Sequence, residues 1–363
     1  MSSKPTIVIA GGGPAGLLAA NMLWKQGFDV TVLEADASLS SRDQGGSLDL
    51  HPHEGQLALK KAGLLESFVA IARHDDQGQR VVDAVTGALV SEEVPEPGTG
   101  LRPEIDRIEL RKMLLESLPA DRVVWGARVA NVVAASGGRW SVCLQNGVVH
   151  ECDLVIGADG AGSAVRAALT DVRPIYTGVT FVELWLTDVD SRHPVIAQQV
   201  GRGTLFALHD GQGLFAQRNG HAVIRAYAAF RTPDDATSRP EIALAGMNQS
   251  DLLARYAGWS PALRSLIADA DRIAAIRPIV SLPVGTRWVS QPGLTLVGDA
   301  AHVMPPLGTG VNLAMLDAAE LAEAIVTATD WRDAVRRQEQ VMLDRSTAIA
   351  EECLRSFGEW FGA

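Results

Sequence analysis

Six residues near the N-terminus, Gly11 to Gly16, read GGGPAG and directly follow an apolar segment, Thr6 to Ala10. Glycine at Gly11 permits a tight turn, at Gly13 it lets the backbone approach a bound group, and at Gly16 it lets a helix pack on a strand. The N–H groups that open the next helix attract phosphate. About twenty residues further on, the carboxylate of Glu34 ends a second apolar segment and can accept hydrogen bonds from ribose hydroxyls. Together these residues predict a dinucleotide-binding turn.

The surroundings of this motif favour a bound nucleotide over a glycine loop without one. A strand precedes the glycines, an apolar helix, Leu17 to Leu23, follows them, and Glu34 stands at the expected distance. The uncharged stretch Ile7 to Trp24 follows Lys4 and has the hydropathy of a signal peptide or a membrane helix. Three successive glycines and a proline argue against both.

Composition predicts an ordered protein of two domains, because the 363 residues are 47% apolar and 21% charged. The formal charge of -11 leaves no basic surface for nucleic acid and no polybasic membrane patch. Cys143, Cys152 and Cys353 have no paired spacing, which favours free thiols in a cytoplasmic protein over disulfides or a metal site. We expect a monomer.

The first half of the chain predicts alternating strands and helices. Amphipathic helices are expected over His53 to Phe68 and Asp106 to Leu118, with a hairpin about Thr86-Gly87 between them. Short strands of a meander follow, and the apolar run Leu154 to Ile156 is expected to return to the first sheet.

The second half of the chain has a different pattern of apolar residues. Alternating apolar runs between Thr180 and Phe230, separated by glycine turns, predict an antiparallel sheet that offers a substrate platform. Helices are expected over Asp251 to Ile267, Val311 to Thr327 and 331–360, with a strand at Leu294 to Val297. We expect a discontinuous cofactor domain (1–72, 101–172 and 277–330), an inserted substrate domain (73–100 and 173–276) and a C-terminal bridging helix (331–363).

Two further glycine motifs follow buried strands. The first is Gly157 to Ser163, containing Asp159, and the second is Gly298 to His302, which leads through Pro306 and Gly310 into a helix. With the first motif, in this order, they resemble the single-component FAD-dependent aromatic hydroxylases of the para-hydroxybenzoate hydroxylase type. The stretches 45–51 and 103–107 are most similar to the tetracycline-inactivating monooxygenases.

This resemblance implies an α/β fold: a Rossmann-like FAD-binding domain with an inserted antiparallel-sheet substrate domain and a C-terminal helix. It implies that FAD lies extended, with its pyrophosphate at the first helix, Asp299 near the ribityl phosphate and the isoalloxazine beside Pro306. The cofactor-binding residues it implies are Gly11, Gly13, Pro14, Ala15, Gly16, Glu34, Arg42, Asp49, Arg107, Asp159, Gly298, Asp299, Pro306, Gly310, Val311 and Asn312.

Physical arguments accompany that placement. The N-terminus of the Val311 helix carries about half a positive charge, which would favour negative charge on reduced flavin. For Asp299, the alternative to a cofactor contact is a purely structural role as a helix cap or turn residue. His302 is expected to pack and hydrogen-bond, with no catalytic role. The Pro306 loop is one residue shorter than in the family, so contacts to the ring need not transfer atom by atom.

Arginines in the predicted cofactor domain offer anion contacts. Arg107 and Arg111 stand one helical turn apart and could reach one anionic group. For Arg111, a solvated position on the surface is as good an interpretation as an anion contact. The resemblance places Arg107 and Arg42 against cofactor phosphate or the nicotinamide nucleotide, and Asp49 near the flavin. Because only one Rossmann motif occurs, it implies that NADPH or NADH binds transiently, near Asp159.

The implied reaction is reduction of FAD by NAD(P)H, addition of O2 at flavin C4a, and transfer of one oxygen atom from the hydroperoxide to a carbon of the substrate. The protein has to hold the substrate and exclude water. We therefore expect a large aromatic or polycyclic substrate, with a tetracycline-like antibiotic or another secondary metabolite as candidates. Alternatives are a Baeyer-Villiger or epoxidising reaction, and a non-catalytic protein that sequesters flavin or ligand.

Three residues of the antiparallel sheet are the candidate substrate contacts. Where the tetracycline-inactivating enzymes carry glutamine, arginine and histidine, matching segments place Glu183, Thr204 and Arg225. Glu183 and Arg225 could form an ion pair in the cavity that closes on itself or opens to grip a polar end of the substrate. An ion pair on the solvent face of the sheet is the alternative.

Overall fold

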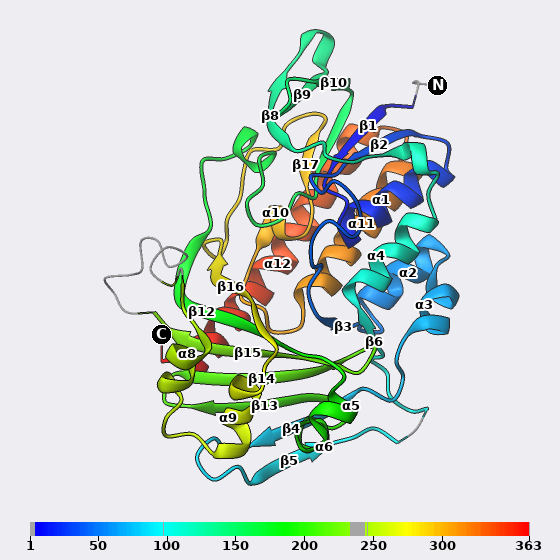
Figure 1. Cartoon of the computed structure of the whole chain (residues 1–363). Helices are drawn as coiled ribbons and strands as arrows, with labels where there is room; N and C mark the ends of the chain where they lie inside the picture. Colours follow the sequence, from blue (N-terminus) through cyan, green and yellow to red (C-terminus); the bar gives the residue numbers. More distant parts are fainter. Residues whose placement is uncertain (1–3, 97, 233–243, 245, 363) are drawn as a thin grey trace.

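The computed structural model describes residues 4–96, 98–232, 244 and 246–362, arranged as two sheet-based parts bridged by a long helix (Figure 1). Within those residues, no helix is both long and apolar enough to cross a membrane.

A five-stranded parallel sheet forms the core of the first part. Its strand order is β17-β11-β1-β2-β7, so the strands come from three separated stretches of chain. The apolar run Leu154 to Ile156 does return to this sheet, where it pairs in parallel with β1. The strand bounds are β1 (Thr6–Ala10), β2 (Asp29–Leu33), β7 (Val123–Val124), β11 (Leu154–Gly157) and β17 (Leu294–Leu296).

Helices cover one face of this sheet and a small sheet covers the other. Ile7 and Ile9 of β1 point to the helices, whereas Val8 points to the small sheet, so both faces are buried as parallel sheets require. The helices are α1 (Pro14–Lys25), α2 (Gly55–Ala62), α3 (Leu65–Ile71), α4 (Arg107–Glu116) and α11 (Gly310–Thr327); the small sheet contains β8 (Val129–Ala134), β9 (Trp140–Leu144) and β10 (Val149–Cys152).

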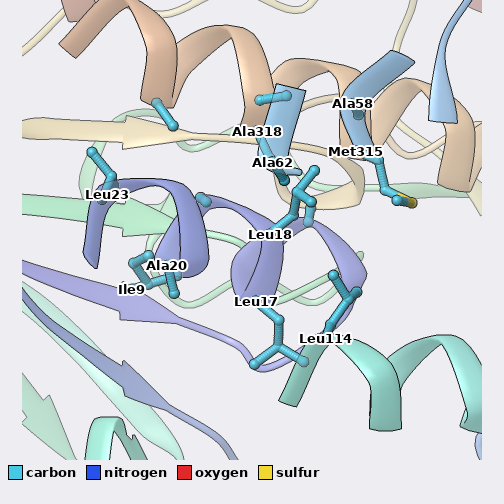
Figure 2. Packing of buried hydrophobic residues seen from close by; sticks show 14 of the residues in the cluster. Ile9, Leu17, Leu18, Ala20, Leu23, Ala58, Ala62, Leu114, Met315 and Ala318 are labelled. Atoms are coloured by element: carbon cyan, nitrogen blue, oxygen red, sulfur yellow. The ribbon is translucent and has the colours of Figure 1, made fainter. Parts of the chain in front are cut away.

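Helices α1, α2 and α11 pack closely because small side chains line their contact. Figure 2 shows Leu18 of α1 between Ala62 of α2 and Met315 of α11, while Leu17 points to Leu114 of α4. Close packing of this kind fixes the position of the α1 N-terminus relative to the α11 N-terminus. The starts of both helices are therefore held rigidly relative to each other.

The second part is a seven-stranded sheet of order β16-β12-β15-β14-β13-β4-β5. It is antiparallel as expected, except that β4 pairs in parallel with β13. One face packs on short helices, with Leu205, Leu214 and Leu263 in that core. The strands are β4 (Gly78–Val82), β5 (Leu89–Glu93), β12 (Ile175–Leu186), β13 (Gly203–His209), β14 (Gln212–Asn219), β15 (Val223–Arg231) and β16 (Arg272–Ser281); the helices are α5 (Val189–Arg192), α6 (Pro194–Val200), α8 (Gln249–Arg255) and α9 (Pro261–Ala268).

Helix α12 (Trp331–Phe361) connects the two parts. Its Trp331 and Val335 belong to the core under the parallel sheet, whereas Phe357 and Phe361 pack on the seven-stranded sheet. A two-stranded ribbon, β3 (Ser47–Asp49) with β6 (Glu104–Asp106), and the short helix α10 (Asp299–His302) also lie between the two sheets (Figure 1).

Two expected helices are each broken in two. The helix expected over His53 to Phe68 ends at Gly63, which adopts φ 68°, a left-handed conformation that terminates α2 before α3 begins. The helix expected over Asp251 to Ile267 ends at Arg255 and restarts at Pro261, where the Ser260 hydroxyl accepts the Leu263 N–H.

Candidate active site

Glycine stands at each position of the first motif for a different structural reason. Gly11 has φ +102°, and a Cβ there would lie 2.3 Å from the Ala158 carbonyl oxygen. A Cβ on Gly16 would lie 2.1 Å from the Gly11 carbonyl oxygen. A Cβ on Gly13, in contrast, meets no atom of the described residues within 4 Å. Gly11 and Gly16 are therefore needed by the fold, while Gly13 leaves space beside the backbone.

That space lies at the start of α1. Gly13 is the N-cap residue and makes no side-chain cap, and Pro14 is the first helical residue. Helix geometry leaves the N–H groups of Ala15 and Gly16 without an intrahelical acceptor, so they could donate to an anion in the open space.

Glu34, which follows β2, is tied to the glycine turn. Its Oε2 accepts the Gly12 N–H at 2.7 Å, and its Oε1 accepts the Asp36 N–H at 2.7 Å. Each carboxylate oxygen has two acceptor positions, and the Arg111 guanidinium also lies 2.9 Å from Oε2, so the capacity that remains for ribose hydroxyls is on Oε1.

Arg111 is buried, so its surface alternative is wrong. Its guanidinium lies 2.9 Å from Glu34 Oε2 and donates to Asp36 Oδ2 at 2.9 Å and to the Gly12 carbonyl at 2.7 Å. Arg107 does not join it on a shared anion among the described residues. Arg111 is thus a support for the glycine turn and its acidic partners.

Asp159 supports its own turn within the second motif. Its carboxylate accepts hydrogen bonds from the Ser163 hydroxyl at 2.5 Å and the Ala164 N–H at 2.8 Å. The backbone of Ala158 and Asp159 lies against Gly11. The first and second motifs therefore meet at the ends of β1 and β11.

The third motif places an exposed acid at the first residue of α10. Gly298 is the N-cap residue, and it has φ +60° and packs on Ala314. Asp299 is exposed and makes no hydrogen bond with any residue that the structure describes, so it is no helix cap. His302 is buried and its Nε2 pairs with Asp317 Oδ2 at 2.5 Å, the packing role expected for it.

The N-terminus of α11 faces the same region without a cap. Thr309 is its N-cap residue and makes no side-chain cap, while Pro306 is exposed and Gly310 and Val311 are half-buried. The Asn312 side chain is fully buried: its oxygen accepts the His51 N–H at 2.8 Å and its nitrogen donates to the Asp49 carbonyl at 2.9 Å. Asn312 therefore fixes the start of α11 to the end of β3.

Two of the expected phosphate ligands differ in their surroundings. Arg42 donates to Asp36 at 2.8 Å and its side chain is mostly exposed. The Arg107 guanidinium makes no hydrogen bond or ion pair within the described ranges. Burial lowers the pKa of Arg107, against the opposing effect of the Asp299 carboxylate. A half-buried guanidinium without a partner is suited to an anionic ligand.

The three candidate substrate residues lie on one face of the seven-stranded sheet. Thr204, Gln217 and Arg225 are directly opposite one another on β13, β14 and β15. Glu183 stands opposite Tyr227, two residues along β15, and thus on the same face. Arg225 Nη1 donates to Glu183 Oε1 at 2.6 Å. Glu183 is 0% and Arg225 8% exposed, so the solvent-face alternative for this pair is wrong.

Aromatic side chains fill the rest of this face. Phe181, Phe206, Phe215 and Tyr227 cluster with Phe357 and Trp360 of α12 and with Leu307, which follows Pro306. Leu307 also packs against a small buried cluster that contains Leu313 of α11 and Cys353 of α12. The apolar part of the sheet therefore reaches the loop that precedes α11.

Sequence reasoning missed four residues of this region. Asp36, Asp43 and Arg277 form ion pairs with predicted site residues, and Glu104 is a buried acid beside Gln217. Only Asp36 had a local signal, since it stands two residues after Glu34. The others depend on contacts between distant segments.

The fold and these motifs define an FAD-dependent monooxygenase of the aromatic-hydroxylase type. The chain belongs to the family described as FAD binding domain, whose model matches residues 4–336. It is 33% identical over 376 residues to monooxygenase asqM of Emericella nidulans, covering 88% of this chain and 83% of the relative.

Solved structures share this fold. Klebsiella pneumoniae HpxO complexed with FAD and uric acid is 21% identical, with a TM-score of 0.81 over 98% of this chain and 89% of that one. Tetracycline destructase Tet(55) is 24% identical, with a TM-score of 0.76 over 98% of this chain and 91% of that one. The expected likeness to single-component hydroxylases is confirmed.

Proposed function

We propose that this protein uses NAD(P)H and O2 to hydroxylate a large aromatic or polycyclic substrate. When bound, FAD supplies the electron transfer and oxygen activation that protein side chains cannot provide. The observation that carries the proposal is the position of Leu307. It joins the loop before α11 to the aromatic face of the sheet, so a substrate on that face would be next to the α11 N-terminus.

The described residues fit FAD. Ala15 and Gly16 offer N–H groups to a pyrophosphate beside the open space at Gly13, and Arg107 offers a guanidinium that pairs with no other described side chain. The α11 N-terminus at Gly310 and Val311 offers positive potential to negative charge on a reduced ring. Glu34 would accept ribose hydroxyls with its remaining acceptor positions. Pro306 would contact the ring edge and Asp299 the ribityl region.

The substrate would lie on the face that carries Thr204, Phe206 and Phe215. Aromatic side chains there contribute large apolar area and keep water from the reacting atoms. Relatives of this fold are bound to uric acid or named for tetracycline, both multi-ring compounds. We therefore include tetracycline-like antibiotics and other secondary metabolites among the candidate substrates.

Stimulated nicotinamide oxidation tests this function. Purified protein should be yellow, oxidise NADPH slowly alone and do so much faster when a substrate is present, in a screen of tetracyclines, polyketides and phenols, repeated with NADH. Product mass and carbon skeleton separate hydroxylation from epoxidation or Baeyer-Villiger insertion. Yellow protein that oxidises neither nucleotide with any compound would instead support a flavin- or ligand-sequestering protein.

A further inference from the structure

Four charged side chains connect the cofactor part to the substrate sheet. Asp43, in the loop after β2, receives two hydrogen bonds from Arg225, at 2.8 and 2.7 Å. Arg225 also donates to Glu183 at 2.6 Å, and Arg277 of β16 donates to the second oxygen of Glu183 at 2.7 Å. We refer to Asp43, Arg225, Glu183 and Arg277 as the clasp.

The clasp is closed on itself. Its two carboxylates and two guanidinia balance in charge, and the Arg225 guanidinium also lies 4.0 Å from the centre of the Trp185 ring, whose Nε1 donates to Glu183. Because Glu183 is fully buried, withdrawing Arg225 to grip a substrate would leave this carboxylate with Arg277 and the Trp185 N–H as its partners, which is costly. The structure shows the closed form of the pair.

The clasp reaches Arg107 through the short loop that follows Asp43. Gly45 has φ +100°, and a Cβ there would lie 3.2 Å from Arg107 Nε. The Gly46 carbonyl accepts the Arg107 N–H at 3.1 Å, and a Cβ on Gly46 would lie 2.9 Å from the Tyr227 hydroxyl. The loop is thus held between the substrate sheet and Arg107, with Asp43 as its charged anchor.

We propose that Asp43 is a positioning residue: through Arg225 it holds the loop 43–46 against Arg107 and so orients that guanidinium toward the anionic part of FAD. The inference rests on the proposed function only in assigning Arg107 to the cofactor. Asp43 itself needs no contact with FAD or substrate, because its oxygens already face Arg225.

Titration of apoprotein with FAD, followed by flavin fluorescence, tests this role without any substrate or NADPH. We expect Asp43→Asn to raise the dissociation constant of FAD about tenfold, within the range for residues that couple through contact. In an Arg107→Gln background the same change should have little further effect, because Asp43 acts through Arg107. If Arg107→Gln binds too weakly to measure, Arg107→Lys serves as the background.

Asp190→Asn is the matched control, because it removes the charge of an ion pair, 2.5 Å long, between Arg218 of β14 and the exposed Asp190 of α5, and it should leave FAD affinity unchanged. The proposal is overturned if Asp43→Asn binds FAD like the parent protein, or if its effect is fully retained in the Arg107 background, as a general loss of stability would produce. Failure to oxidise NADPH would contradict the proposed function and leave this titration unaffected.

Discussion

The Arg111 guanidinium lies 2.9 Å from the Glu34 carboxylate, and both side chains are buried between α4 and the end of β2. Arg111 also pairs with Asp36, so one cation contacts two carboxylates beside the glycine turn. A buried pair of this kind is costly to break, because Glu34 would keep no cationic partner among the described residues, whereas Asp36 would keep Arg42.

Arg111→Leu is therefore expected to lower the free energy of unfolding by about 3–5 kcal/mol, measured by urea denaturation of the apoprotein. Arg122→Ala, which removes an exposed ion pair with Asp29, should cost less than about 1 kcal/mol. If both changes lower the free energy of unfolding equally, the buried network contributes no more to stability than an exposed ion pair.

Gly13→Phe should separate folding from cofactor binding. Because a Cβ at Gly13 meets no described atom within 4 Å, we expect the variant to fold with unchanged circular dichroism and melting temperature. The new ring would occupy the space proposed for the pyrophosphate, so the purified protein should lack flavin. Gly258→Phe, at another open glycine, should keep its flavin. A yellow Gly13→Phe protein would contradict the pyrophosphate site.

Glu104 should make stability depend on pH. Burial, opposed by the Ser47 hydrogen bond, raises the pKa of this carboxyl from 4.5 to about 7. The folded state thus binds the proton more tightly than the unfolded chain, and the free energy of unfolding falls as pH rises from about 4.5 to about 7, by at most about 3 kcal/mol.

Glu104→Gln should remove this dependence, which urea denaturation at several pH values measures. The pKa of His51, raised to about 9 mainly by its hydrogen bond to Asp49, adds a loss between pH 6.5 and 9 in both proteins. Glu93→Gln, on the exposed strand β5, should keep the parent profile. A parent-like profile in Glu104→Gln would show that Glu104 titrates normally.

Thr204→Trp should affect substrate and spare the cofactor. Thr204 is half-buried on the sheet face that carries Gln217 and Arg225, so a large ring there would fill the proposed substrate position. We expect normal FAD content and basal NADPH oxidation, with at least about a tenfold loss of substrate stimulation, equivalent to about 1.4 kcal/mol. Ser91→Trp on β5 should retain stimulation, and equal stimulation in both variants would move the substrate elsewhere.

Local sequence signals predicted the parts of the site that are themselves local. One turn explains why glycine is needed at Gly11, Gly13 and Gly16. The structure shows the close backbone contacts at Gly11 and Gly16. The break before Pro261 was not predicted, although Ser260 and Pro261 carry the local signal of a cap and a first helical residue. The helical periodicity on both sides of the break outweighed that signal.

Contacts between distant segments were only partly predictable. The Glu183–Arg225 pair was predicted as one alternative, because the family resemblance placed an acid and a base on the expected antiparallel sheet. Asp43 stands 182 residues from Arg225, and no periodicity or motif connects them. The buried state of Arg111 likewise depends on where α4 packs, which helical spacing alone does not fix. Tertiary approach, not local propensity, determines these partners.

Isotopic labelling of the product tests most directly whether the protein transfers an oxygen atom from O2 to its substrate. With a compound that stimulates NADPH oxidation, the reaction is run under isotopically labelled O2 in ordinary water, and the product is analysed by mass spectrometry. A monooxygenase of this type gives a product that contains one oxygen atom derived from O2. A product whose added oxygen comes from water, or NADPH consumption that yields only hydrogen peroxide with every compound tried, would contradict the proposed function.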